Sequence, residues 1–313
     1  MADLFTVLTD KDVLDASQIE EWKEGVILAA AEMNHFGPGS PLVSQTKKAE
    51  ASIATFLKFA QLTGGTAVLT DGVEVDSVAV VDTEINLTLA EQGNVVTTTS
   101  LAKIVSGGRL DPAVAELVGK NMGTSMDILA IQVLEAGTNE LVVTQATEAE
   151  LTASDKITTA YVEKAYNKLR RNKIQPLIGT GYVAVMHPDV VSDLRNVAAA
   201  GDWVDVAKYS SLQLVLQNEV GFFKGFKIIE DANVTINTDV GAAAVDTYHS
   251  LFMGYNALGY GESISNAPHP TLVGETDKLN RFAHFGWYGV FKYGIIEQNA
   301  IWKITSASSF GAN

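Results

Sequence analysis

The sequence GYVAVMHPDVVSDLR, residues 181–195, joins two apolar patterns at one polar step. Residues 182–186 are a continuous apolar run of strand length that stops at His187. Pro188 suits the first position of a helix, because the N–H that proline lacks has no partner there. Asp189 then lies in the first turn, where the helix dipole favours a negative charge. The segment therefore predicts a strand followed directly by a helix, with His187 as the boundary residue.

The His187-Pro188-Asp189 step also admits chemical interpretations. A histidine beside an aspartate is a candidate metal ligand, or a general base with its orienting carboxylate. The same three residues are the signature of chaperone J-domains, where they lie between two helices of a short basic module. Here they follow a strand in an acidic chain. Because the strand-to-helix interpretation accounts for every residue of the stretch, we predict an architectural role.

The charge balance argues against one class of function. Of the 313 residues, 22 are Lys or Arg and 37 are Asp or Glu, so the net charge is −15. Tight sequence-independent binding of nucleic acid needs a basic face that displaces phosphate counterions. The sequence has no signal peptide pattern and no apolar run near the ~20 residues that span a bilayer. We expect a soluble protein that is not secreted by the usual route and does not enter a membrane.

A search for local catalytic motifs finds none. Cysteine is absent, which removes disulfides, thiolate ligands and cysteine nucleophiles. No two of the five histidines are four residues apart, and no phosphate loop, dinucleotide fingerprint or nucleophile elbow is present. The glycine clusters at 179–182 and 259–262 lack a further glycine and the strand-turn-helix context. We predict no catalytic, cofactor-binding or metal site, although a triad of distant residues stays open.

The clearest helix covers residues 109–136. Asp111 is a good N-cap, and Pro112 takes the first helical position. At 1.5 Å per residue a helix of this length runs ~40 Å. Gly119 and Gly123 each weaken its middle by roughly 1 kcal/mol relative to alanine. We therefore expect a bend or a close packing contact near these glycines.

Residues 51–105 predict a long antiparallel hairpin. Apolar and polar residues alternate over residues 85–90, the period of a half-buried strand. Asp71-Gly72 is a dipeptide of the hairpin-turn type. The acidic residues around it lack the ligand count and spacing of a calcium loop. A two-stranded ribbon is marginally stable alone in water, so the hairpin folds back onto its own domain or lies on another subunit.

The chain as a whole predicts an α+β fold. Residues 16–35 have helical spacing, and the GPGSP segment at 37–41 ends that helix, so residues 1–50 form an arm. A further helix is expected at 154–173. Helices and strands follow one another without regular βαβ alternation, which disfavours a doubly wound parallel sheet.

Five motifs in one order resemble the major capsid proteins of tailed double-stranded-DNA phages, a fold shared with encapsulins and the herpesvirus capsid floor. They are a helix ending in Arg170-Arg171, the segment YVAVMHPDVVSDLR followed by Trp203, GFFKGFKIIE, LFMGYNALGYGE, and a C-terminal block that contains Gly286-Trp287. The structural landmarks that we carry forward are Asp111, Pro112, His187, Pro188, Asp189, Trp203 and Trp287.

The resemblance implies an architecture. It comprises an N-terminal arm (1–50), an extended E-loop hairpin (51–105), a peripheral domain with a long spine helix (106–150, completed by 271–313) and an axial domain (151–270). In this family the hairpin lies over the neighbouring subunit. The candidates for contacts between subunits are the residues of the hairpin tip, Asp71, Gly72, Glu74 and Asp76.

The resemblance also implies a function. The chain would self-assemble into pentamers and hexamers that form an icosahedral shell around phage genomic DNA, without enzymatic activity or a cofactor. Its partners would be other copies of itself, a separate scaffolding protein and a portal, with decoration proteins left open. It would be assembled in the bacterial host cytoplasm and end in the virion capsid.

Two alternatives remain. The first is an encapsulin-type shell that encloses a cargo enzyme, since encapsulins share the fold. The second is a soluble enzyme whose triad uses one of His187, His249 and His284. No local motif favours the enzyme.

Overall fold

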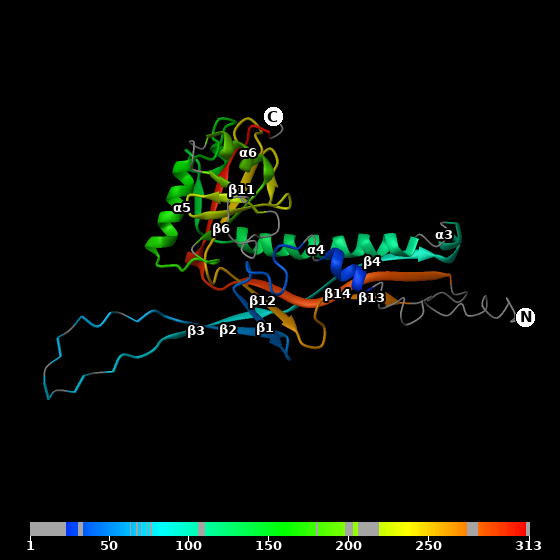
Figure 1. Cartoon of the computed structure of the whole chain (residues 1–313), viewed down its shortest axis with the longest axis horizontal. Coiled ribbons are helices and arrows are strands. Elements are labelled where there is room, and N and C mark those ends of the chain that lie inside the picture. The colour runs from blue at the N-terminus through cyan, green and yellow to red at the C-terminus, as the bar shows by residue number, and fades with distance from the viewer. Residues whose placement is uncertain are drawn as a thin grey trace, which may run out of the picture.

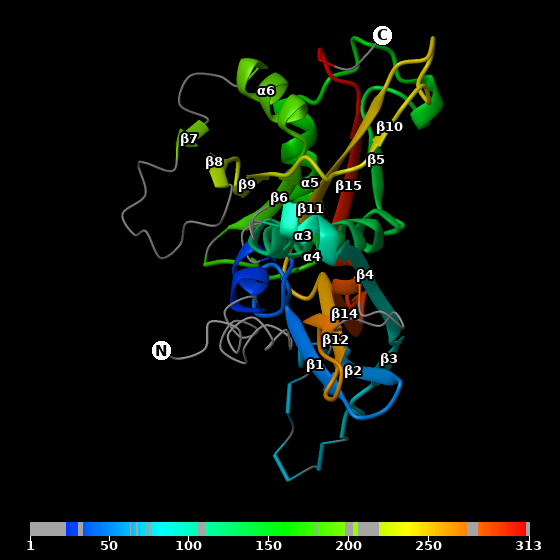
Figure 2. The ribbon, with the colours of Figure 1, turned by 90° about the vertical axis from the view of Figure 1, so that its right-hand side faces the viewer.

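The chain is built around one long helix, α4 (Leu110–Glu135), in a computed structural model. The described residues are 23–30, 34–62, 64–66, 68–69, 71–72, 74–75, 77–105, 110–179, 181–197, 203–205, 219–273 and 281–310. A large sheet stands on one side of α4, a small sheet lies on the other, and a ribbon projects away from both (Figures 1 and 2). No described helix is both long and apolar enough to cross a membrane.

The large sheet has eight strands in the described part of the chain. They are, in order, β5 (Glu140–Val142), β15 (Ile301–Ser306), β11 (Thr247–Met253), β6 (Tyr182–Met186), β9 (Phe226–Glu230), β8 (Glu219–Phe223) and β7 (Trp203–Asp205), with β10 (Ile236–Asn237) paired to β11. Alternate residues of β6 face two cores. Tyr182, Ala184 and Met186 pack with helices α5 (Thr159–Arg171) and α6 (Pro188–Val197). Val183 and Val185 face the core that contains α4. This two-sided burial explains why the run has no polar residue.

The small sheet carries the N-terminal part of α4. Its described strands are β1 (Gln45–Ala49), β12 (Leu258–Ser263), β14 (Phe282–Ile295) and β13 (His269–Val273), with β4 (Ala90–Thr99) paired along β14. The short helix α3 (Ser100–Val105) follows β4, and 3-10 turns lie at η1 (Glu148–Glu150) and η4 (Gln298–Ala300). Val114, Val118 and Met122 of α4 pack with Trp287 and Phe285 of β14.

The middle of α4 is a site of close packing, one of the two outcomes expected there. The helical segment 23–30 crosses the spine at Gly119. A Cβ built on Gly119 would lie 2.5 Å from the carbonyl oxygen of Val26 and 2.7 Å from Cβ of Ala29. Glycine is therefore needed where the arm helix meets the spine.

Strand pairing differs from the expected domain boundaries at three places. Strand β15 (301–306) lies in the large sheet, although we expected residues 271–313 in the peripheral domain. Strand β12 (258–263) lies in the small sheet, although we expected it in the axial domain. Residues 90–99 of the expected hairpin form β4 and pair with β14. The local pattern shows that each segment is a strand. Which strand it pairs with depends on segments that are distant in the sequence.

The ribbon consists of β2 (Ile53–Phe59) and β3 (Asp82–Thr88), an antiparallel pair. Leu89 is buried, and Ile85 and Leu87 are half-buried, whereas Asn86 and Thr88 are exposed. The alternation expected over residues 85–90 is confirmed for residues 85–89, whereas Ala90 is half-buried. Figure 1 shows the connection between the two strands extending far from the body.

Candidate assembly surfaces

The strand-to-helix joint at His187 is confirmed. Strand β6 ends directly before His187, and α6 begins directly after it. The Nδ1 atom of His187 accepts a hydrogen bond from the N–H of Asp189 at 3.3 Å, so the histidine caps the helix. The Tyr248 hydroxyl donates to Oδ2 of Asp189 at 3.1 Å. Burial and this carboxylate raise the pKa of Tyr248 to about 12. His187 and Asp189 therefore both have structural partners.

Asp193, in the same helix, anchors the end of the chain. It is buried and accepts hydrogen bonds from the Ser308 hydroxyl at 2.9 Å and the Ser309 N–H at 2.7 Å. The Ser309 hydroxyl also donates to it. Buried carboxylates are costly unless they are satisfied in this way. Sequence reasoning used Asp193 only as part of a motif and missed its role, although an acidic residue on an apolar helix face was a signal.

Glycines make room for the base of the ribbon. A Cβ on Gly261 would lie 2.7 Å from Cβ of Ala54, and a Cβ on Gly294 would lie 2.2 Å from Leu87. Phe56 of the ribbon is buried nearby with Ile296. The glycine cluster at 259–262 therefore serves close strand packing, as glycines inside strands often do. An ion pair between Lys58 and Glu297 fastens the same end of the ribbon to the body.

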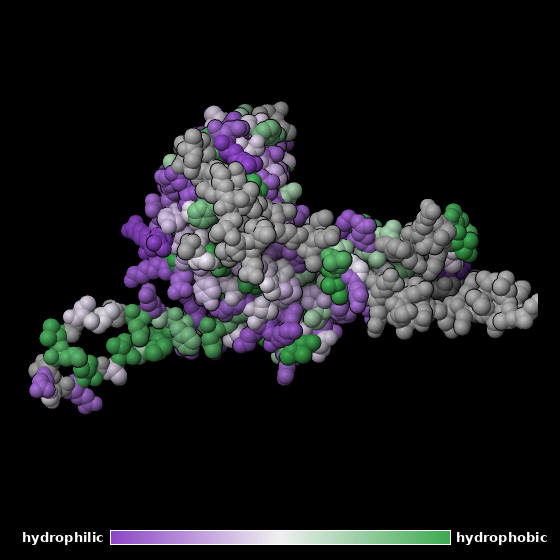
Figure 3. Space-filling view, in the orientation of Figure 1, coloured by the Kyte–Doolittle hydropathy of each residue, from purple (hydrophilic) through white to green (hydrophobic). Residues whose placement is uncertain are grey.

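The described outer part of the ribbon exposes several large apolar side chains. The outermost backbone hydrogen bond between its described residues joins the N–H of Ala60 to the carbonyl of Val81 at 2.9 Å. Among the described residues beyond that bond, the exposed large apolar side chains are Leu62, Val68, Leu69, Val75, Val78 and Val80. Val68 is 95% exposed. Figure 3 shows this apolar surface at one extremity of the molecule. A patch of this kind marks an interaction site, because soluble monomers rarely leave large apolar surfaces in water.

The predicted tip residues lie at the far end of the ribbon. Asp71 and Gly72 form a turn, and Gly72 has a φ of 75°, a value that favours glycine. Both residues are exposed, as is Glu74. Asp76 lies outside the described residues. The turn is confirmed, while the contacts with another subunit stay a prediction.

A second exposed apolar patch lies at the opposite extremity, around α3. Its members are exposed side chains of β4, α3 and α4, namely Val95, Leu101, Ile104, Val105 and Leu117. Figure 1 places α3 and the ribbon toward opposite ends of the long axis, and Figure 3 shows apolar surface in both regions. We call the patch around α3 the distal patch.

The remaining landmarks are structural where they can be followed. The Nε1–H of Trp287 donates to Oδ1 of Asn121 at 2.9 Å and so ties β14 to α4. Trp203 is the first residue of β7, and its side chain lies outside the described part. Helix α4 begins at Leu110, so Asp111 lies inside the helix rather than at its N-cap, and Pro112 is its third residue rather than its first. Nothing is described of their side chains.

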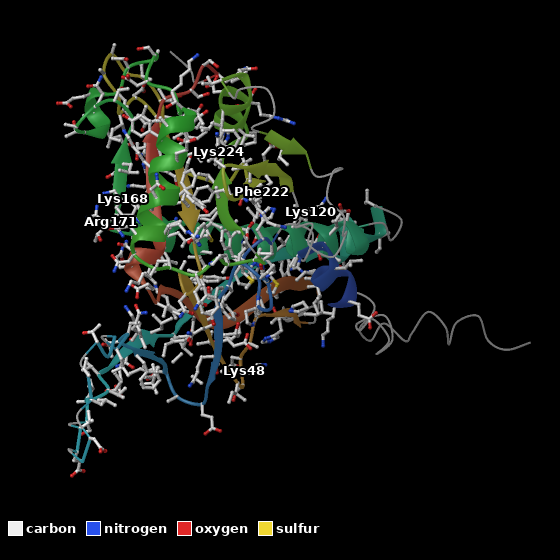
Figure 4. All side chains as sticks on the ribbon, turned by 60° about the vertical axis from the view of Figure 1, so that its left-hand side comes forward. Lys48, Lys120, Lys168, Arg171, Phe222 and Lys224 are labelled. Atoms are coloured by element: carbon white, nitrogen blue, oxygen red, sulfur yellow. The ribbon has the colours of Figure 1, made fainter. Side chains whose placement is uncertain are left out.

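Several basic side chains have local partners. Ion pairs join Lys48 to Glu262 at 3.2 Å and Lys224 to Glu163 at 3.2 Å. Lys120 pairs with Glu116 in the next turn of α4, and Lys168 lies over the ring of Trp302. Figure 4 shows these lysines on different elements. Helix α5 carries several basic residues, with Lys168, Arg170 and Arg171 in its last turn.

The other two histidines named for a triad have structural neighbours as well. His249 lies between two glutamates, 3.6 Å from Glu135 and 3.3 Å from Glu148. Burial alone would raise the pKa of Glu148, but hydrogen bonds from Thr247 and Asn237 and the nearby His249 lower it. His284 lies 2.9 Å from the hydroxyl of Thr97.

A further histidine cluster, around His35, was not found from the sequence. His35 of the arm lies 2.7 Å from Oδ2 of Asp127 in α4 and 3.4 Å from Oδ2 of Asp231, just after β9. All three residues are buried. Burial would lower the pKa of His35, but the two carboxylates raise it to about 9. No local spacing signals the cluster, because its members come from three distant segments.

Comparison with known proteins identifies the fold. The capsid of Ralstonia phage GP4 matches with a TM-score of 0.73 at 14% identity, over 85% of this chain and 87% of that chain. The capsid of cyanophage Pam1 matches with a TM-score of 0.63 at 13% identity, over 90% and 92%. A virus-like particle from Pyrococcus furiosus matches with a TM-score of 0.52 at 11% identity, over 91% and 98%. No protein-family model matches the sequence, and no curated protein does.

These identities are low, so the matches establish the fold and leave the function to be inferred. They extend over most of each chain, and they agree with the fold implied by the five sequence motifs. The chain has the major capsid protein fold of tailed phages.

Proposed function

We propose that the chain is a structural subunit that self-assembles into the icosahedral shell of a tailed phage. One observation carries the proposal: an apolar ribbon extends from a body with this fold, and the described residues of the chain leave it uncovered. A subunit with such a surface is completed by contact with another copy. The role is structural rather than enzymatic.

The ribbon would work as a strap between subunits. Its base is held by the buried side chains of Ala54 and Phe56 and by the Lys58–Glu297 ion pair, so its direction is set by the body. Its free part reaches on the order of 35 Å beyond the outermost backbone hydrogen bond at ~3.3 Å per residue. Burying each exposed valine or leucine on a neighbour contributes about 1.5–3 kcal/mol at full burial. Several such residues give a contact that closes a shell.

The two sheets correspond to the two domains of the proposed subunit. The large sheet with α5 and α6 is the axial domain, whose tips meet at the centre of a pentamer or hexamer. The small sheet with α4 is the peripheral domain. The distal patch, at the far end of the peripheral domain, supplies a second contact, between neighbouring capsomers.

The charge fits a container of DNA. With a net charge of −15 and lysines held in local ion pairs, the inner wall would enclose phage DNA without gripping it. We propose that a separate scaffolding protein and a portal take part in assembly in the host cytoplasm, and that the chain ends in the virion capsid. The surfaces for decoration proteins are left open.

The test is assembly of the purified full chain. Expressed alone, and together with the scaffolding protein of the same phage, it should form closed particles that are visible by negative-stain and cryo-electron microscopy. Particles with pentameric and hexameric capsomers are the expected result. Monomers under every condition would overturn the proposal.

A second candidate is an encapsulin-type shell with an enzyme cargo. The match to the virus-like particle from Pyrococcus furiosus, which spans 98% of that chain, favours keeping it. The contents of purified particles separate the two: a phage shell holds DNA, whereas the alternative holds a co-purifying enzyme. Neighbouring genes separate the two candidates as well. Terminase and portal genes would indicate a phage shell, whereas a gene for a cargo enzyme would indicate an encapsulin-type shell.

A further inference from the structure

Three ionisable side chains from three parts of the chain meet in the interior. His35 belongs to the arm loop, Asp127 to the middle of α4, and Asp231 to the residue after β9. One ligand atom of each lies within 4.8 Å of the others. The Nδ1 atom of His35 is 2.7 Å from Oδ2 of Asp127 and 3.4 Å from Oδ2 of Asp231. Two carboxylates and one imidazole thus converge on a single point.

Both carboxylates are held in place by the backbone. Oδ1 of Asp127 accepts hydrogen bonds from the N–H groups of His35, at 2.8 Å, and Phe36, at 3.1 Å. Oδ1 of Asp231 accepts one from the N–H of Asn233 at 2.8 Å. Each carboxylate therefore has one fixed oxygen and turns the other toward the imidazole. Outer hydrogen bonds of this kind orient the ligands in metal sites.

One of the inner oxygens is unsatisfied. Oδ2 of Asp231 is buried and has no hydrogen-bond partner among the described residues, and its side chain is only 2% exposed. A proton on Nδ1 of His35 serves Asp127 but leaves this oxygen bare, which is costly for a buried carboxylate. With a doubly protonated imidazole and two ionised carboxylates, the three side chains also carry one net negative charge. A divalent cation beside a neutral imidazole would satisfy the oxygen and cancel the charge.

We propose that His35, Asp127 and Asp231 bind one divalent transition-metal ion of the Zn²⁺ type. One imidazole and two carboxylates form a donor set that suits zinc, whereas Ca²⁺ and Mg²⁺ prefer oxygen ligands alone. Tetrahedral ligands at ~2.0–2.1 Å from zinc lie about 3.3 Å apart. The His35–Asp231 separation already meets this value, and the His35–Asp127 pair opens by roughly 0.6 Å.

The site has an entrance and a mechanical consequence. His35 and Asn34 line a cavity of about 640 Å³ together with Met126 and Ile229, so an ion would reach the site from the side of His35. The bound ion would fasten the arm loop, the spine helix and the large sheet at one point. This inference does not depend on the function proposed above.

The experiment titrates the full chain with Co²⁺ after purification with a chelator and dialysis. The wild type should bind one Co²⁺ per chain, with visible absorption bands that show inner-sphere ligands, and Zn²⁺ should displace it. Asp231→Asn removes one ligand and should weaken binding at least tenfold. His249→Gln is the matched control, because it alters another histidine between two carboxylates and should leave Co²⁺ binding unchanged.

The wild type alone can overturn the proposal. Circular dichroism first checks that Asp231→Asn is folded; if it is not, the decision rests on wild-type chain with metal alone. Zn²⁺ should then raise its Tm by several degrees through preferential binding to the folded state, and Ca²⁺ at equal concentration should not. If the wild type does not bind Co²⁺ stoichiometrically, the three residues form only a proton-bridged cluster. That result, or equal binding by folded Asp231→Asn, refutes the metal site.

Discussion

Strands β11 and β3 both have seven residues and both pair antiparallel with a neighbour, yet their burial is opposite. Every residue of β11 is buried, whereas β3 has none that is fully buried. Strand β11 has partners on both sides and lies between the core of α5 and α6 and the core of α4. Within the described part of the chain, strand β3 pairs with β2 alone, and only the base of the ribbon touches the body.

Under the proposed function, the difference separates the residues that stabilise the monomer from those that join subunits. The large sheet buries its apolar residues against other parts of the same chain, so its stability is a property of the monomer. The ribbon leaves its apolar residues in water, and a two-stranded ribbon alone is marginal. Substitutions in the first region should therefore change unfolding, and substitutions in the second should change association.

The largest effect is expected when the free part of the ribbon is removed. Replacing residues 62–80 by a short glycine-asparagine turn should abolish closed shells, because the neighbouring subunit loses its strap. The body should stay folded, with its Tm unchanged, because the deleted residues pack on nothing described in their own chain. Electron microscopy and calorimetry measure the two outcomes. Normal shells from the deletion would show that the ribbon is no strap.

A matched pair of leucine substitutions tests the large sheet and the ribbon with the same chemical change. Leu251 in β11 is fully buried, whereas Leu69 in the ribbon is 70% exposed. Leu251→Ala leaves a cavity and should lower the free energy of unfolding by about 2–5 kcal/mol. Leu69→Ala should change it by less than about 0.5 kcal/mol but raise the concentration needed for assembly. Urea unfolding and light scattering test both. Equal losses of stability would contradict the division.

Acid should weaken the region of the large sheet through Asp155. Burial alone would raise the pKa of Asp155, but hydrogen bonds from Thr144, Thr152 and Gln145 lower it from 3.8 to about 2. A lowered pKa stabilises the fold above the unfolded value and loses that contribution as the pH falls from about 4 to about 2. The contribution is about 1–2 kcal/mol at neutral pH.

The corresponding measurement is urea unfolding of Asp155→Asn and wild type at several pH values. The variant should be less stable at neutral pH, and the gap should narrow below pH 4 as the wild-type carboxylate is protonated. Ala153→Ser, a small change at an exposed position of the same loop, is the control and should match the wild type. A gap that is constant with pH would refute the role of the charge.

The smallest effect is expected at the motif that indicated the fold. His187→Ala removes a helix cap and should lower the free energy of unfolding by about 1 kcal/mol. Shells should still form, because His187 lies at a joint within the subunit. Asn196→Ala, on the exposed side of the same helix, is the control. An unchanged unfolding midpoint for His187→Ala would contradict the cap.

Much of the local structure was predictable. Patterns in consecutive residues predict the joint at His187, the long helix and the alternation over residues 85–89. They do so because the period of burial follows from the backbone geometry. The order of the motifs also identified the fold, which the structural comparisons confirm. The expected hairpin was correct at its turn and too long at its C-terminal end, where β4 joins β14.

The rest depended on contacts between distant segments. Nothing in residues 301–306 says that β15 pairs with β11, and nothing near Asp193 says that Ser308 and Ser309 will donate to it. The meeting of His35 with Asp127 and Asp231 has no local signal at all.

By itself, the sequence predicted several of the helices and strands, the acidic charge, and an order of motifs that matches the major capsid protein fold. These properties depend on local periodicity and composition. Only the tertiary structure decided which sheet each strand joins, which polar groups become buried partners, and that the described part of the ribbon is left without a cover. Those outcomes depend on which distant surfaces meet, because burial and pairing are properties of the packed chain rather than of any single segment.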